Sequence, residues 1–224
     1  MALFLIQLAL YLTISVISKV TADELIPRSA NMSQSGAWCW FADPRAVHHK
    51  NQTYVGFIDT FGNITIAAYD HSTGSLKEHT LYQHMIKDDH SNPSIHIRPD
   101  GHILVLWSGH AGPHMFYRRS VHPLDITEWE QVVKVPVNTK GHYGYTYPNP
   151  VTLSSEGDDL YLFWRGGDFN PNYAKLDNKK KTWSDVKELV TVPGQRPYMK
   201  IRSNDKDTIH FAFTEAHPRN MVTK

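Results

Sequence analysis

Two histidines near the middle of the chain flank a pair of predicted strands. His90 lies in the segment DDHSNP (88–93), and His110 follows the apolar run 103–107, which predicts a buried strand. The turn before that run is predicted at 99–101, Pro-Asp-Gly. A strand–turn–strand unit returns the chain to the end that it left. We therefore expect His90 and His110 to lie at one rim and to face one cleft.

These residue types suit acid–base chemistry near neutral pH. An imidazole titrates there and can take or give a proton. Asp88 or Asp89 can fix the tautomer of His90, and Asn92 adds a carboxamide to the same segment. The competing interpretation is structural, because a histidine at a strand end is more often a hydrogen-bonded group without a chemical role.

The elements that must position these groups are short strands separated by Gly, Asn, Asp and Pro, an all-β pattern with no sustained helical period. Strands are predicted at 53–58, 64–69, 95–97, 103–107, 115–119, 132–135, 160–164, 173–176 and 209–214. A weak repeat of about fifty residues predicts four-stranded blades of a β-propeller. The segment 176–184 resembles a degenerate Asp-box turn that keeps Asp and Trp but lacks the usual Gly.

The chain of 224 residues holds about three blades and part of a fourth, so we expect an incomplete propeller over 37–224, a truncated N-terminal portion. A small open sandwich is the alternative. Residues 1–22 predict a signal peptide and 23–36 a polar lead-in, which favours a secreted, extracellular protein. An N-terminal membrane anchor is the alternative, although the apolar run is short for a bilayer span of about 20 residues.

The composition of the chain favours some classes of binding partner over others. The formal net charge of +1 favours neither nucleic acid nor, after signal cleavage, a membrane. Aromatic residues make up 12%, which suits a carbohydrate binder. Sequons at Asn31, Asn51 and Asn63 predict a glycoprotein. Cys39, between two tryptophans, is the single cysteine, so no internal disulfide forms and a buried thiol is expected.

Six segments occur in the order of a known family. They are WCWFADPRAV (38–47), DDHSNP (88–93), YRRS (117–120), YPNPV (147–151), RPY (196–198) and FTEAHPR (213–219). Together they resemble the BNR-4 repeat family, which includes secreted ulvan lyases, seven-bladed β-propellers that cut uronate-containing polysaccharide by β-elimination. The resemblance runs from residue 38 to the end of the chain.

The resemblance implies a catalytic set and a wider substrate-binding set. The catalytic residues that it implies are His90, His110, Tyr147 and Arg165, where the arginine neutralises the substrate carboxylate and Tyr145 competes for the role of Tyr147. The substrate-binding residues that it implies are Asn92, Tyr145, Arg196, His217 and Arg219. The Tyr147–Arg165 gap is slightly longer than the family pattern.

β-Elimination on a uronic acid removes the C5 proton and expels the sugar linked through O4. A cation must stabilise the charge that develops on the carboxylate, and a guanidinium stays charged and binds carboxylates bidentately. Tyr147 can act as base or acid if a nearby cation lowers its pKa, and either histidine can take either role. The chemistry requires no cofactor, and we expect a structural metal ion at most, because no tight zinc-ligand spacing is present.

The leading hypothesis is thus a polysaccharide lyase acting on an acidic polysaccharide. A carbohydrate-binding propeller without catalysis is the first alternative, and it does not need the full His/Tyr/Arg set. A sialidase-type hydrolase is the second, and it requires an arginine cluster, a Tyr–Glu pair and an acidic catalyst. The residues Arg45, Arg118, Arg119 and Arg165 leave this second alternative open.

Overall fold

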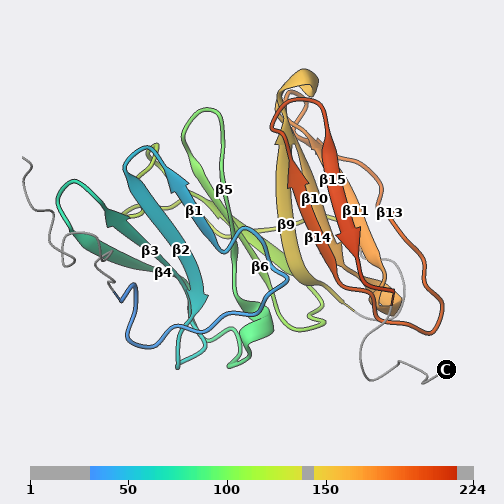
Figure 1. Cartoon of the computed structure of the whole chain (residues 1–224), viewed down its shortest axis with the longest axis horizontal. Helices are drawn as coiled ribbons and strands as arrows, with labels where there is room; N and C mark the ends of the chain where they lie inside the picture. The colour runs from blue at the N-terminus through green and yellow to red at the C-terminus, as the bar shows by residue number, and fades with distance from the viewer. Residues whose placement is uncertain (1–30, 138–143, 216–224) are drawn as a thin grey trace, which may run out of the picture. The chain divides into compact units, whose positions relative to one another are not determined.

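The structure, a computed structural model, describes residues 31–137 and 144–215 (Figure 1). The predicted signal peptide, most of the polar lead-in, and two of the predicted substrate contacts, His217 and Arg219, lie outside these ranges. The regular structure of the described residues is strand, apart from three short 3-10 helices: η1 (Asp89–Ser91), η2 (Ser154–Glu156) and η3 (Gly167–Phe169). Within these ranges no helix has the length and apolar character that a membrane span requires.

The strands form four antiparallel sheets in which sequence neighbours pair. The first contains β1 (Ala46–His49), β2 (Gln52–Ile58), β3 (Ile64–Asp70) and β4 (Leu76–Tyr82). The second contains β5 (Ser94–Ile97), β6 (Ile103–Ser108), β7 (Met115–Arg119) and β8 (Val133–Lys134). The third contains β9 (Thr146–Leu153), β10 (Asp159–Arg165), β11 (Pro171–Asp177) and β12 (Thr182–Trp183), with β13 (Lys187–Glu188) also on β11. The fourth pairs β14 (Met199–Ser203) with β15 (Ile209–Phe213).

This order confirms the all-β prediction and its blade-like repeat. The first strands of successive sheets contact each other, β1 with β5, β5 with β9, and β9 with β14 (Figure 1). Apolar side chains fill the space between neighbouring sheets. Trp107 is fully buried in the cluster that joins the first and second sheets, and Trp164 is fully buried in the one that joins the second and third.

Several strands were not predicted, and β9 shows why. Its sequence TYPNPVTL contains two prolines, which lack an N–H and normally argue against a strand. β9 is the edge strand of the third sheet and pairs only with β10, so a proline nitrogen can face away from the hydrogen-bond ladder. β1, β4 and β14, and the two-residue strands β12 and β13, were also missed.

The antiparallel order decides where the polar groups gather. Strands β5 and β9 begin at the end of their sheets where β6 and β10 finish. His90 precedes β5 and His110 follows β6, whereas Tyr147 lies at the start of β9 and Arg165 closes β10. The topology therefore brings all four predicted catalytic residues to one end of the second and third sheets.

Candidate active site

One carboxylate holds the two histidines side by side. Asp88 Oδ1 lies 2.6 Å from His90 Nδ1, and Asp88 Oδ2 lies 3.1 Å from His110 Nδ1. The two imidazole rings stack at a centroid distance of 3.9 Å and an interplanar angle of 3°. Because each Nδ1–H donates to Asp88, Nε2 is the acceptor nitrogen of each ring, and that of His110 faces Arg165 Nη2. The expectation that the two histidines meet at one rim is confirmed.

The electrostatics of this group favour an ionised Asp88 beside a neutral His110. Burial alone raises the pKa of Asp88, but hydrogen bonds from the His90 backbone and side chain outweigh burial and lower it. Burial, together with the neighbouring His90 and Arg165, lowers the pKa of His110 below its ordinary value, despite the opposing effect of Asp88. His110 therefore stays a neutral imidazole over a wider pH range than a free histidine.

Tyr147 lies beneath the histidines and is 2% exposed. Its ring is stacked against His90 at 5.6 Å between centroids, and its hydroxyl lies 3.6 Å from Cys39 Sγ. Burial raises the pKa of Tyr147, and the nearby Arg165 only partly opposes this. The condition named above, a pKa of Tyr147 lowered by a nearby cation, is therefore not met, and this phenol keeps its proton at neutral pH.

Arg165 is buried, at 5% exposure, and its guanidinium is held by aromatic rings. Its Cζ lies 4.7 Å from the ring centroid of Tyr147 and 5.2 Å from that of Tyr198. Its Nη2 is 3.4 Å from His110 Nε2. No carboxylate among the described residues forms an ion pair with it, so its charge is available to an incoming anion.

The loop after His110 is fixed to the start of β9. Gly112 and Tyr145 exchange backbone hydrogen bonds of 3.1 and 2.8 Å, and the Ala111 N–H donates to Thr146 Oγ1 at 2.8 Å. These bonds set His110 over the strand that carries Tyr147. Tyr145 itself is 4% exposed, packs on Trp164 in the core, and donates its hydroxyl to the Val137 carbonyl.

Asn92 is fully buried and performs a supporting role in this structure. Its Oδ1 accepts the Cys39 N–H at 2.9 Å, and its Nδ2 donates to the Pro93 carbonyl at 3.3 Å. Cys39 is 6% exposed, which confirms the buried thiol. Asn92 thus holds the Cys39 segment against the candidate site.

Arg196 lies beside the site on an aromatic residue that was not predicted. Its Cζ is 4.3 Å from the Phe169 ring centroid, and Arg165 Cζ is 5.4 Å from the same ring. Tyr198 was also missed as a site residue, and its ring stacks on Phe41 at 4.1 Å. The RPY segment was a visible signal for Tyr198, whereas nothing in the sequence around Phe169 indicated that a backbone φ of 64° would bring its ring to Arg165.

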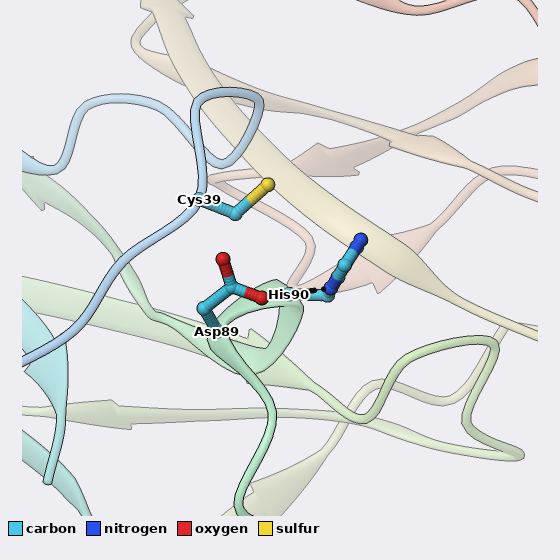
Figure 2. Close-up of side chains that lie close together, drawn as sticks. All are labelled: Cys39, Asp89 and His90. Carbon is cyan, nitrogen blue, oxygen red and sulfur yellow. Dashed lines mark ion pairs between the residues drawn. The ribbon is translucent and has the colours of Figure 1, made fainter. Parts of the chain in front are cut away.

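Two overlapping groups of side chains have the donor types of a metal site. Asp88, His90 and His110 form one group, and Cys39, Asp89 and His90 form the other, each with one ligand atom per residue within 4.8 Å of the others. Figure 2 shows the Cys39 thiol directed into the space beside Asp89 and His90, with Asp89 Oδ1 3.0 Å from His90 Nδ1. Thiolate, carboxylate and imidazole are the ligands that Zn²⁺ prefers.

The three sequons differ in their surroundings. Asn31 and Asn51 are exposed. The Asn63 side chain is engaged on both sides, because its Nδ2 donates to Asp59 Oδ2 at 2.8 Å and its Oδ1 accepts the His84 N–H at 3.0 Å. A glycan on Asn63 would have to share the nitrogen that makes this contact.

Comparisons with known proteins agree with the fold and the sequence motifs. The chain is 26% identical over 221 residues to an "Ulvan Lyase-PL25" of Pseudoalteromonas sp. (strain PLSV), covering 80% of this chain and 44% of that protein. It is 26% identical over 166 residues to an "Ulvan lyase" of Alteromonas sp. (strain LOR), covering 63% of this chain and 33% of that protein. The chain therefore spans less than half the length of either relative.

The solved structure of a polysaccharide lyase PL25 ulvan lyase superposes with a TM-score of 0.61 at 19% identity, over 80% of this chain and 47% of that one. A second structure, bound to -[GlcA(1-4)Rha3S]-, gives a TM-score of 0.60 at 18% identity, again over 80% and 47%. These neighbours are β-propellers, and the four sheets described above correspond to blades of that fold. Residues 52–224, well over half of the chain, match the BNR repeat-containing family, and the chain belongs to that family.

Proposed function

We propose that this chain carries the catalytic face of a polysaccharide lyase that cleaves a uronate-containing polymer by β-elimination. The observation that supports this best is the guanidinium of Arg165, which has no carboxylate partner among the described residues and lies 3.4 Å from His110 Nε2. A uronate carboxylate is bonded to C5, the carbon that loses its proton. A carboxylate bound by Arg165 would therefore bring C5 next to an imidazole nitrogen.

His110 is the base in this proposal. Asp88 accepts its Nδ1–H, so the lone pair of Nε2 is directed away from Asp88. The lowered pKa of His110 keeps this nitrogen unprotonated. When His110 takes the C5 proton, Asp88 stabilises the resulting imidazolium, and Arg165 stabilises the negative charge that spreads onto the substrate carboxylate.

Tyr147 is the acid. Its raised pKa keeps the phenolic proton, which the leaving O4 atom requires as the C4–O4 bond breaks. The hydroxyl rests against Cys39 Sγ, so in the reaction it exchanges this weak contact for the leaving oxygen. His90 is stacked between His110 and Tyr147 and holds both rings in place.

The substrate class follows from the relatives and from the charge of the site. Two relatives are named ulvan lyases, and one solved neighbour is bound to GlcA and sulfated rhamnose units. We propose an acidic polysaccharide of this type, met outside the cell after the predicted export. The proposed chemistry uses only side chains of this chain.

The first test is to incubate the folded protein with ulvan and to follow the near-ultraviolet absorbance of the unsaturated uronate product. A His90→Ala/Tyr147→Ala double variant is the control. Absorbance that the control lacks supports the proposal. New reducing ends without the chromophore would indicate a hydrolase, and saccharide binding without any cleavage by folded protein would indicate a binding module.

A further inference from the structure

A pocket lies between the second and third sheets at the end opposite the candidate active site. Its volume is about 370 Å³, within the size range of small-ligand sites. Leu104 and Leu106 of β6 contribute apolar side chains, and Tyr117 of β7 and Trp183 of β12 contribute aromatic rings. Leu104 is at the start of β6, whereas His110 follows the end of that strand, so the two sites occupy opposite ends of the sheet.

Planar polar groups are fixed around this pocket before any ligand arrives. Arg98 Nη2 donates to Asn178 Oδ1 at 2.7 Å, which links the second sheet to the third. Arg119 Nη1 pairs with Glu130 Oε1 at 2.6 Å, and Arg119 Nη2 pairs with Asp100 Oδ2 at 3.4 Å. Donors and acceptors held in this way lose little entropy when a hydroxylated ligand binds.

The turn that supplies Trp183 has a counterpart in the first sheet. In the β3–β4 turn, the Asp70 carboxylate accepts the N–H groups of Ser72 and Thr73 at 2.8 and 3.2 Å. In the β11–β12 turn, the Asp177 carboxylate accepts those of Lys179 and Lys180 at 3.0 and 2.7 Å. The backbone N–H four residues after each Asp returns to its carbonyl at 2.8 Å in both turns. The two turns therefore have the same construction.

The two turns differ in side chains that their shared hydrogen bonds do not determine. The fourth position after each Asp is left-handed, with φ of 70° at Gly74 and 58° at Lys181. Glycine adopts this conformation freely, whereas lysine is strained there. The strained Lys181 lines the pocket, and its Nζ lies 3.0 Å from Asn178 Oδ1. Trp183 occupies the position that Leu76 occupies in the first sheet.

From these observations we infer that the pocket is a second saccharide-binding site, which takes an anionic sugar unit. The aromatic rings provide faces for a pyranose, the fixed Arg, Asp, Glu and Asn groups hydrogen-bond its hydroxyls, and Lys181 meets a carboxylate or sulfate. Lys179, exposed in the same turn, adds positive charge nearby, whereas Lys180 Nζ lies 3.5 Å from Asp177 Oδ2. The site binds without cleaving. The assignment of an anionic sugar as the ligand rests on the proposed function, whereas the existence of the second site does not.

The test is calorimetric titration of the full chain with an ulvan oligosaccharide in an Arg165→Ala background, where the first site is disabled. We expect binding to persist in this background. Lys181→Gly should weaken it about threefold to fivefold, the effect of one exposed charge contact, and should also raise Tm by about 2–4 °C because strain is relieved. Trp183→Leu, which copies the first sheet, should weaken it at least about tenfold through lost ring contact.

Lys50 provides a matched control. It is an exposed lysine in the β1–β2 turn with a φ of 45°, and it does not line the pocket. Lys50→Gly should raise Tm similarly and leave affinity unchanged. Equal affinity in the two glycine variants, or no binding in the Arg165→Ala background, would overturn the inference. Binding with no lyase activity in the unmodified chain would overturn the proposed function alone.

Discussion

The start of β1 and the starts of β5 and β9 lie at the same end of neighbouring sheets, yet the charged side chains near them have different partners. Before β1, Asp43 is 3% exposed and forms ion pairs with Arg45, at 3.3 Å, and with Lys200. Arg45 also donates to the Cys39 carbonyl, so the charges of this group are compensated by neighbouring groups of the protein. Before β5, Asp88 holds two imidazoles whose Nε2 atoms are free of it, and Arg165 has no carboxylate among the described residues.

This difference indicates a structural role for the charged groups before β1 and a chemical role for those near β5 and β9. A buried carboxylate with two cations is satisfied and adds rigidity, because Lys200 connects the fourth sheet to the segment before the first. A buried guanidinium beside an oriented imidazole, with no carboxylate partner among the described residues, is suited to bind an anion that arrives from outside. Substitutions near β5 and β9 should therefore reduce activity more than stability, and substitutions near β1 should reduce stability more than activity.

The largest effect is expected at Tyr147. Tyr147→Phe removes one oxygen and retains the ring packing against His90 and Arg165. If the phenol is the acid, kcat should fall by about a thousandfold on ulvan. Tm should change little, because the lost partner is the weak Cys39 contact.

Cys39→Ser is the matched control for this substitution, since it changes the other side of the same contact and leaves the phenol in place. It should retain most of kcat. A Tyr147→Phe variant as active as the unmodified chain would exclude Tyr147 as the acid.

Arg165→Lys comes next. The charge is kept, but the planar fork that binds a carboxylate bidentately is lost, and so is its stacking against two tyrosine rings. We expect kcat/KM to fall by about a hundredfold, with part of the loss in KM because the substrate carboxylate is bound less well. Steady-state kinetics over a range of ulvan concentrations separate the change in KM from the change in kcat. A loss confined to kcat would contradict the carboxylate-binding role.

The next prediction concerns His96, on β5, and the pH dependence of stability. The Nε2 of this residue is buried with no hydrogen-bond partner among the residues that the structure describes. Burial, aided by Arg98 and opposed by Asp205 and Asp100, lowers the pKa of His96 to about 4. Between pH 4 and its ordinary value near 6.5, the unfolded chain binds a proton that the folded chain does not. Stability should therefore fall as the pH falls, by about 2 kcal/mol between pH 7 and 5.

Urea denaturation at both pH values measures this loss. His96→Gln removes the titrating group, so the pH dependence of the free energy of unfolding should become shallower by the same amount. An unchanged slope in this variant would assign the loss to other groups.

The sequence predicted the strands that carry alternating or continuous apolar residues, because burial imposes that pattern. It missed β9, whose prolines are tolerated at a sheet edge, and β14, whose pattern is short. It also predicted the meeting of His90 and His110, because one hairpin separates them. Phe169 and Tyr198 were not predicted as neighbours of Arg165, because their contacts depend on a left-handed backbone turn and on a fourth sheet, neither of which is local in sequence.

The smallest effect is expected at Asp43. Asp43→Asn keeps the shape and removes the charge, which leaves Arg45 and Lys200 without their shared partner. Because these two side chains are 27% and 43% exposed, water replaces part of the lost interaction. We expect the free energy of unfolding to fall by about 1–2 kcal/mol, less than for a fully buried pair. Activity per folded molecule should stay within about twofold, since Asp43 does not contact the histidines, Tyr147 or Arg165. A large loss of kcat in well-folded Asp43→Asn protein would join the two regions into one functional unit and remove the distinction between them.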